Sequence, residues 1–161
     1  MRRQRSVQFS FVLSLVLALL LQLIALPDWL GIVRPYWLPM VLSYWALCEP
    51  RVSSLIGGFI VGLAADVVFG TVLGQHALAL VVVAYLVSRL RGVFVLFELW
   101  QATLVLVPIW ALYTFLLFWI DGLTGHQASA QLRWMPIIPT TLLWPLVYGL
   151  MVRWLRPRRD D

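Results

Sequence analysis

The chain has 161 residues, of which 62% are hydrophobic and 12% are charged, and its mean hydropathy is +0.91. Because a soluble domain is about half apolar and about a quarter charged, this composition excludes an ordinary water-soluble fold. The apolar residues fall in runs of about twenty, the length that crosses a hydrocarbon core of roughly 30 Å. We therefore predict an all-α integral membrane bundle of about six transmembrane helices, which occupies residues 1–161 as a single domain.

The first predicted span covers residues 6–26. It is too long for the apolar core of a signal peptide, which has about 7–15 residues, and its end lacks an A-x-A cleavage pattern. We therefore expect a retained helix. Turns are expected at 49–51 and 89–92, and a polar loop at 121–135. The remaining spans are predicted over residues 36–48, 52–69, 76–88, 93–120 and 136–155.

All basic residues are arginines, and the net charge is +5. In a soluble protein this charge would suggest nucleic acid, but here the arginines lie at the ends of apolar runs. Two of them, Arg34 and Arg133, fall on one side of the predicted membrane. The other ten fall on the opposite side: Arg2, Arg3, Arg5, Arg51, Arg89, Arg91, Arg153, Arg156, Arg158 and Arg159. The positive-inside rule then places both termini in the cytoplasm, and we predict contact with membrane lipid and none with nucleic acid.

Asp66 lies in the third predicted span, roughly 21 Å along the helix from Val52, which places it in the outer half of the bilayer. A carboxylate at that depth is costly and normally faces a partner inside the bundle. It shares a four-residue period with Gly58, Gly62 and Gly70, and such a stripe lets another helix approach closely. Asp66 is either a proton- or ligand-handling group or, as we favour, an acid that hydrogen-bonds a neighbouring helix or turn.

Gln75 and His76 open the fourth predicted span, ten residues beyond Asp66. We expect Gln75 to cap free helix amides and His76 to pair with Asp66, either as a proton relay or as a lock between two helices. The lock is favoured, because no serine or cysteine stands nearby to complete a catalytic triad. With the single cysteine Cys48 and no clustered histidines, we predict no catalytic, cofactor or metal site.

A second small-residue stripe lies in the first predicted span. Ser10, Ser14, Ala18 and Gln22 recur every four residues, and Gln22 adds a group able to hydrogen-bond another helix. We interpret this stripe as a packing face; a polar ligand pocket near Gln22 is the alternative.

Several motifs together resemble one known family. They are Arg34-Pro35-x-Trp37, Tyr44-Trp45-Ala46-Leu47, Pro50-x-Val52, Gly62-x-x-x-Asp66 and Leu73-Gly74-Gln75-His76-Ala77-Leu78. This run is similar to the rod shape-determining protein MreD family, in its gammaproteobacterial branch. The resemblance covers essentially the whole chain; between residues 34 and 78 it rests on motifs, and in the C-terminal half mainly on hydropathy.

The resemblance implies a non-enzymatic member of the elongation (Rod) complex, which directs lateral peptidoglycan synthesis and rod cell shape. The implied main partner is the bitopic MreC, in a larger complex with MreB, RodZ, RodA and its penicillin-binding transpeptidase. The implied fold looks similar to the S components of energy-coupling-factor transporters. Our leading hypothesis is a scaffold whose small-residue stripes and external face bind MreC.

Two other functions stay open at this stage. A small-molecule-binding transporter subunit of the S-component type would need a polar pocket near Asp66, Gln22 and His76. A proton channel would need ionisable groups along the whole membrane path, and Asp66 alone does not supply them.

Overall fold

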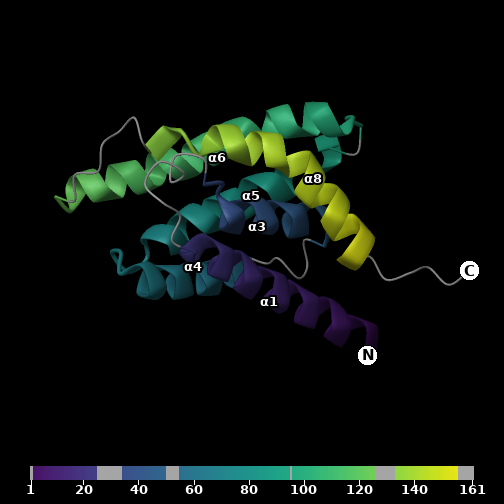
Figure 1. Cartoon of the computed structure of the whole chain (residues 1–161), viewed down its shortest axis with the longest axis horizontal. Helices are drawn as coiled ribbons and strands as arrows, with labels where there is room; N and C mark the ends of the chain where they lie inside the picture. Colours follow the sequence, from purple (N-terminus) through teal and green to yellow (C-terminus); the bar gives the residue numbers. More distant parts are fainter. Residues whose placement is uncertain (1, 25–33, 50–54, 95, 126–132, 156–161) are drawn as a thin grey trace, which may run out of the picture.

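The computed structural model describes residues 2–24, 34–49, 55–94, 96–125 and 133–155. This part of the chain holds six helices and no strand, which confirms the predicted all-α bundle. Helices α3 and α5 lie at its centre, with α6 and α8 on one side and α1 and α4 on the other (Figure 1). The helices are α1 Arg2–Leu23, α3 Trp37–Cys48, α4 Leu55–Phe69, α5 Gln75–Phe94, α6 Leu99–Leu123 and α8 Ile137–Leu155.

Helix α3 is the most deeply buried element. Every residue from Leu38 to Ala46 is buried, so the helix is apolar on all sides instead of amphipathic. Ser43, its fully buried polar residue, donates to the Pro39 carbonyl at 2.6 Å and accepts from Trp110 Nε1 at 3.3 Å. These bonds remove the cost of burying a hydroxyl without a partner.

The small-residue stripe of α1 packs against α3, as the four-residue spacing predicted. Ala18 is buried, and Ser14 Oγ accepts a hydrogen bond of 2.8 Å from Trp45 Nε1. At the end of the helix Gln22 Oε1 accepts the Trp37 amide at 3.0 Å. Because Gln22 belongs to α1 and Trp37 begins α3, this bond satisfies an amide that has no partner inside its own helix.

The glycine stripe of α4 packs against α5. A Cβ atom added to Gly62 would lie 2.5 Å from the Ala77 amide nitrogen, whereas one added to Gly58 would lie 3.5 Å from the Leu80 carbonyl oxygen. Gly62 therefore sets the backbone approach of α4 to α5. The hypothesis that this stripe receives MreC is wrong in this respect, because a helix of the same chain already covers it.

Gly70 does not belong to the packing face, and this part of the prediction is wrong. It is exposed, has a φ of +64°, and a Cβ atom there would meet nothing within 4 Å. The Thr71 amide beyond it donates to the Asp66 carbonyl at 3.1 Å, the closing bond of a Schellman turn. Gly70 ends α4 because glycine adopts a left-handed conformation without strain.

The predicted turn at 89–92 is helical instead. Helix α5 continues to Phe94, and α6 begins at Leu99 and not at Val93. Arginine and leucine favour helix, so Arg89–Arg91 extends α5 by another turn and keeps its charges exposed. The start of α6 carries a capping box, in which the Glu98 amide donates to Gln101 Oε1 at 3.1 Å.

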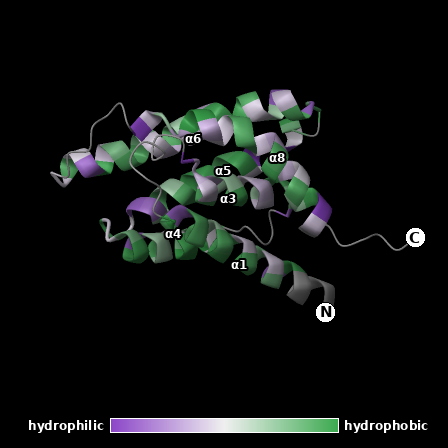
Figure 2. Ribbon diagram, viewed as in Figure 1, coloured by the Kyte–Doolittle hydropathy of each residue, from purple (hydrophilic) through white to green (hydrophobic). Residues whose placement is uncertain are grey.

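The outside of the bundle is apolar. Hydrophobic residues cover most of each helix in Figure 2, including the outward faces. Among the described residues, three helices have the length and composition to cross a membrane, namely α5, α6 and α8 as far as Trp154; the apolar segment Val7–Leu23 of α1 and the helices α3 and α4 are shorter. On α8 a row at four-residue spacing is at least 57% exposed: Ile138, Leu142, Leu146, Leu150 and Trp154.

An apolar exterior of this extent is stable only against lipid or another protein. The bundle is therefore that of an integral membrane protein. Residues 25–26, 52–54 and 95 of the predicted spans lie outside the described residues, as do 50–51 of the predicted turn and 126–132 of the predicted loop. The number of crossings and the cytoplasmic placement of the termini stay predictions.

Candidate functional site

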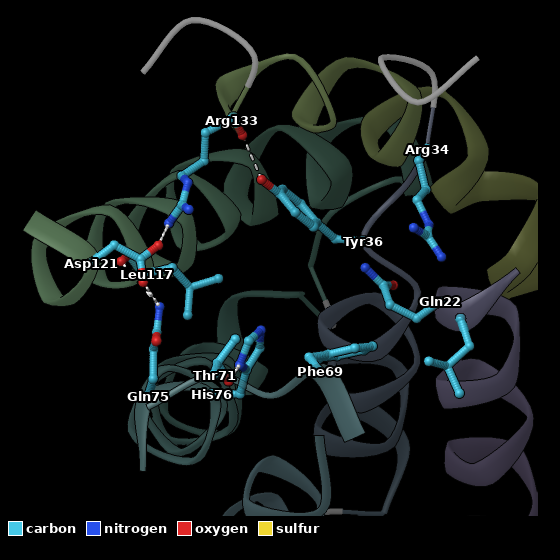
Figure 3. A pocket seen from close by; sticks show the side chains of 11 residues that line it. Gln22, Arg34, Tyr36, Phe69, Thr71, Gln75, His76, Leu117, Asp121 and Arg133 are labelled. Atoms are coloured by element: carbon cyan, nitrogen blue, oxygen red, sulfur yellow. Dashed lines mark hydrogen bonds and ion pairs between the residues drawn. The ribbon is translucent and has the colours of Figure 1, made fainter. Parts of the chain in front are cut away.

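Polar side chains gather at one end of the bundle, around a pocket of about 390 Å³. This end contains the last turns of α1, α4 and α6 and the first turns of α3, α5 and α8 (Figure 3). The lining mixes ionisable, polar and apolar groups: Gln22, Leu23, Arg34, Tyr36, Phe69, Thr71, Gln75, His76, Leu117, Asp121 and Arg133.

The carboxylate of Asp66 lies beneath this pocket and is 1% exposed. Its Oδ1 accepts from Thr71 Oγ1 at 3.0 Å and from the His76 amide at 2.8 Å. Its Oδ2 accepts from the Gly74 amide at 2.8 Å and lies 3.5 Å from the Ala77 amide. Both oxygens are thus occupied by donors from the α4–α5 link and the first turn of α5.

Asp66 therefore caps α5 from a neighbouring helix. The first amides of a helix have no intrahelical partner, and a negative charge beside them is also favoured by the helix dipole. We expected Gln75 to supply this cap, and that prediction is wrong. Gln75 Nε2 instead donates across the bundle to Asp121 Oδ1 at 2.7 Å and to the Leu117 carbonyl at 3.3 Å.

His76 lies next to Asp66, as its position in the sequence suggested. Its Nδ1 is 2.8 Å from Asp66 Oδ1, and Thr71 Oγ1 lies 3.2 Å from the same nitrogen. An ionised carboxylate only accepts, so the proton of this bond lies on Nδ1. The imidazole also stacks in a tilted arrangement on Phe69, with ring centroids 5.3 Å apart. These contacts tie the end of α4 to the start of α5.

Asp121 joins α6 to the start of α5 and to the segment before α8. One carboxylate oxygen receives the Gln75 amide, and the other forms an ion pair with Arg133 Nη1. The Arg133 carbonyl in turn accepts the Tyr36 hydroxyl at 2.6 Å, and the Tyr36 amide donates to Thr140 Oγ1 at 2.9 Å. The network connects the entrance of α3 with α5, α6 and α8.

Arg34 is the exception in this network. Its Nε and Nη2 atoms are buried and have no hydrogen-bond partner among the described residues. Gln75 is 3% exposed, and its Oε1 also lacks a partner in that part of the chain. Figure 3 places Arg34 and Gln75 on opposite sides of the pocket. The pocket thus offers donors on one side and an acceptor on the other.

Four of the predicted residues, Gln22, Arg34, Gln75 and His76, line the pocket, and Asp66 lies just beneath it. Gly58 and Gly62 lie deeper, between α4 and α5. Within the described ranges, no three metal-ligating side chains come together.

Sequence reasoning missed the contributions of Tyr36, Thr71, Asp121 and Arg133 to the site. Thr71 follows Asp66 at the spacing of a closing turn, which is a usable signal. The roles of Tyr36, Asp121 and Arg133 depend on contacts between distant segments, and their local sequence does not reveal such contacts.

The fold and this polar end define a class: an integral membrane helical bundle whose helix ends are joined by a buried polar network. A family model described as rod shape-determining protein MreD matches residues 3–154. The chain is also 31% identical over 146 residues to a protein of Haemophilus influenzae named "Rod shape-determining protein MreD", covering 89% of this chain and 88% of that protein. The chain belongs to the MreD family. No solved structure matches it, so the likeness to S components stays a prediction.

Proposed function

We propose that this protein is a non-enzymatic membrane component of the bacterial elongation complex, which binds MreC and helps to regulate lateral wall synthesis and rod shape. The family match over residues 3–154 carries the proposal. We place it in the inner membrane, with six crossings and both termini in the cytoplasm, because of the arginine distribution. MreB, RodZ, RodA and its penicillin-binding transpeptidase would be reached through the larger complex.

The hydrogen bonding of the polar end supports a structural role for its buried acid. Both oxygens of Asp66 are taken by donors of the same chain, and His76 Nδ1 is taken by Asp66. A general acid or base needs a free position within hydrogen-bond reach of a substrate, and the Asp66 carboxylate has none among these contacts. The contacts of Asp66 therefore support a lock that holds α4 and α5 together.

MreC needs a surface that the chain does not use for itself. Apart from Gly70, both small-residue stripes pack against helices of this chain, so we place the dock on the outward row of α8 that runs from Ile138 to Trp154. This row spans roughly 24 Å at 1.5 Å per residue, enough for most of a membrane crossing. Evenly spaced side chains form a ridge that fits the groove of a single partner helix.

A photoreactive amino acid at Leu142, on the α8 row, is expected to crosslink MreC in living cells. Leu142 is 74% exposed; Ile56 on α4 is 70% exposed and serves as the matched control. We expect crosslinks at Leu142 and Leu146 and none at Ile56. Crosslinks to MreC from Ile56 alone would move the dock to α4 and contradict the assignment to α8.

A second candidate function is a small-molecule-binding subunit of the S-component type. The pocket favours it, because Gln22 and His76 both line a space whose size is typical of ligand sites. Detergent pull-down with mass spectrometry separates the two functions. MreC and wall synthases among the retained proteins support the scaffold, whereas transport ATPase subunits support the alternative.

A further inference from the structure

The pocket contains two polar groups that the fold leaves unsatisfied. Arg34 holds two buried guanidinium nitrogens without a partner among the described residues, and Gln75 holds a buried carbonyl oxygen in the same condition. The other charged groups of the lining, Asp121 and Arg133, neutralise each other in an ion pair. Arg34 is therefore the lining cation without a counter-charge in the described chain. Arg34 is half-buried, and leaving two buried nitrogens of a cation without a partner is costly, so this arrangement favours an anion.

The geometry also restricts the remainder of the ligand. Gln75 Nε2 donates to the Asp121 carboxylate. The other terminal atom of this side-chain amide is therefore the carbonyl oxygen Oε1, which is an acceptor. A complementary ligand must bring a hydrogen-bond donor to Gln75 while its anionic group meets Arg34. Guanidinium binds phosphate particularly well, because its planar fork matches two oxygens at once.

We propose that this pocket binds a phosphate group that carries a hydrogen-bond donor nearby, as the head group of phosphatidylethanolamine or phosphatidylglycerol does. A volume of about 390 Å³ lies at the lower end of the range for small-ligand sites, so it suits a head group and not a whole lipid. The rim also contains Leu23, which is 44% exposed on α1. Exposed Leu20 and Leu17 continue from it along the helix, a path for an acyl chain.

The test uses the full chain, purified in detergent and stripped of lipid, with lipid binding followed by native mass spectrometry. Phosphatidylethanolamine is expected to bind more tightly than phosphatidylcholine, which has the same net charge but no donor in its head group. Arg34→Gln is expected to weaken the binding of phosphatidylethanolamine about tenfold or more, which corresponds to the loss of one charge-assisted hydrogen bond. Arg34→Lys should retain part of the affinity, since it keeps the charge and loses the fork.

Arg153→Gln is the matched control, because it removes the same charge from an exposed site on α8 at the opposite end of the bundle. Ligand-free Arg34→Gln should melt no lower than the wild type, because the buried nitrogens make no bond that the change would break. Equal affinity of wild type and Arg34→Gln for phosphatidylethanolamine would overturn the proposal.

Soluble phosphoethanolamine identifies the source of the phosphate. If it binds as tightly as the lipid and depends equally on Arg34, the pocket takes a free phosphomonoester. If it binds far more weakly, the acyl chains contribute and the ligand is a membrane lipid. Either result supports the phosphate site, provided that the dependence on Arg34 holds.

Discussion

Gly62→Ala is expected to destabilise the protein by about 3 kcal/mol or more, the upper range for overpacking a tight interface. The added Cβ would lie 2.5 Å from the Ala77 amide nitrogen and 2.8 Å from the His76 carbonyl carbon. These are backbone atoms, so no side-chain rotation relieves the overlap and α4 must separate from α5. Thermal unfolding in detergent, followed by tryptophan fluorescence, measures the effect.

Gly58→Ala is the matched control on the same helix face. There a new Cβ would meet its nearest atom at 3.5 Å, which is an ordinary van der Waals contact. We expect its free energy of unfolding to lie within about 1 kcal/mol of the wild-type value, because alanine also has a higher helix propensity than glycine. If the two variants have the same melting temperature, α4 and α5 do not approach as closely at Gly62 as the structure indicates.

Asp66→Ala is expected to have the largest effect of any single change at the polar end. It leaves the amides of Gly74 and His76, the Thr71 hydroxyl and the imidazole without their acceptor. Orphaned buried donors cost about 1–3 kcal/mol each, though such costs are not additive within one network. We expect the free energy of unfolding to fall by about 3–5 kcal/mol, in the range for breaking a buried ion pair. The same unfolding assay measures it.

Two further variants separate the cap from a general loss of charge. Glu49→Ala removes an exposed acid at the end of α3 and should leave the melting temperature almost unchanged. Asp66→Asn keeps one accepting oxygen and should fall between the wild type and Asp66→Ala. An Asp66→Ala protein that melts normally would show that Asp66 does not act as the cap of α5.

These expectations also affect the interpretation of partner-binding experiments. Loss of MreC from Asp66→Ala or Gly62→Ala would report a damaged bundle, because both residues lie between α4 and α5 and not on the outer surface. Substitutions on the exposed row of α8, such as Leu142, test docking without disturbing the core. Each co-purification result therefore needs the melting temperature of the same variant beside it.

The prediction of the helices was most accurate where the apolar run was bounded by proline or a strongly polar turn. The spans predicted at 36–48 and 136–155 differ from α3 and α8 by one residue at the start. The prediction was least accurate around Arg89–Arg91, where charge was taken as a turn signal although arginine favours helix. A charged final turn at a membrane boundary keeps its helix, because the backbone remains bonded while the side chains reach water.

The sequence by itself determined the membrane class, the helical content and the two small-residue stripes, because composition and four-residue periodicity are local properties. It also placed Asp66 and His76 within reach of each other, since only a short link separates them. Tertiary structure alone decided which helix covers each stripe, that Asp66 and not Gln75 caps α5, and that Arg34 faces the pocket without a counter-charge among the described residues. Periodicity identifies the face of a helix that is buried, but the partner of that face depends on how the six described helices pack around one interior.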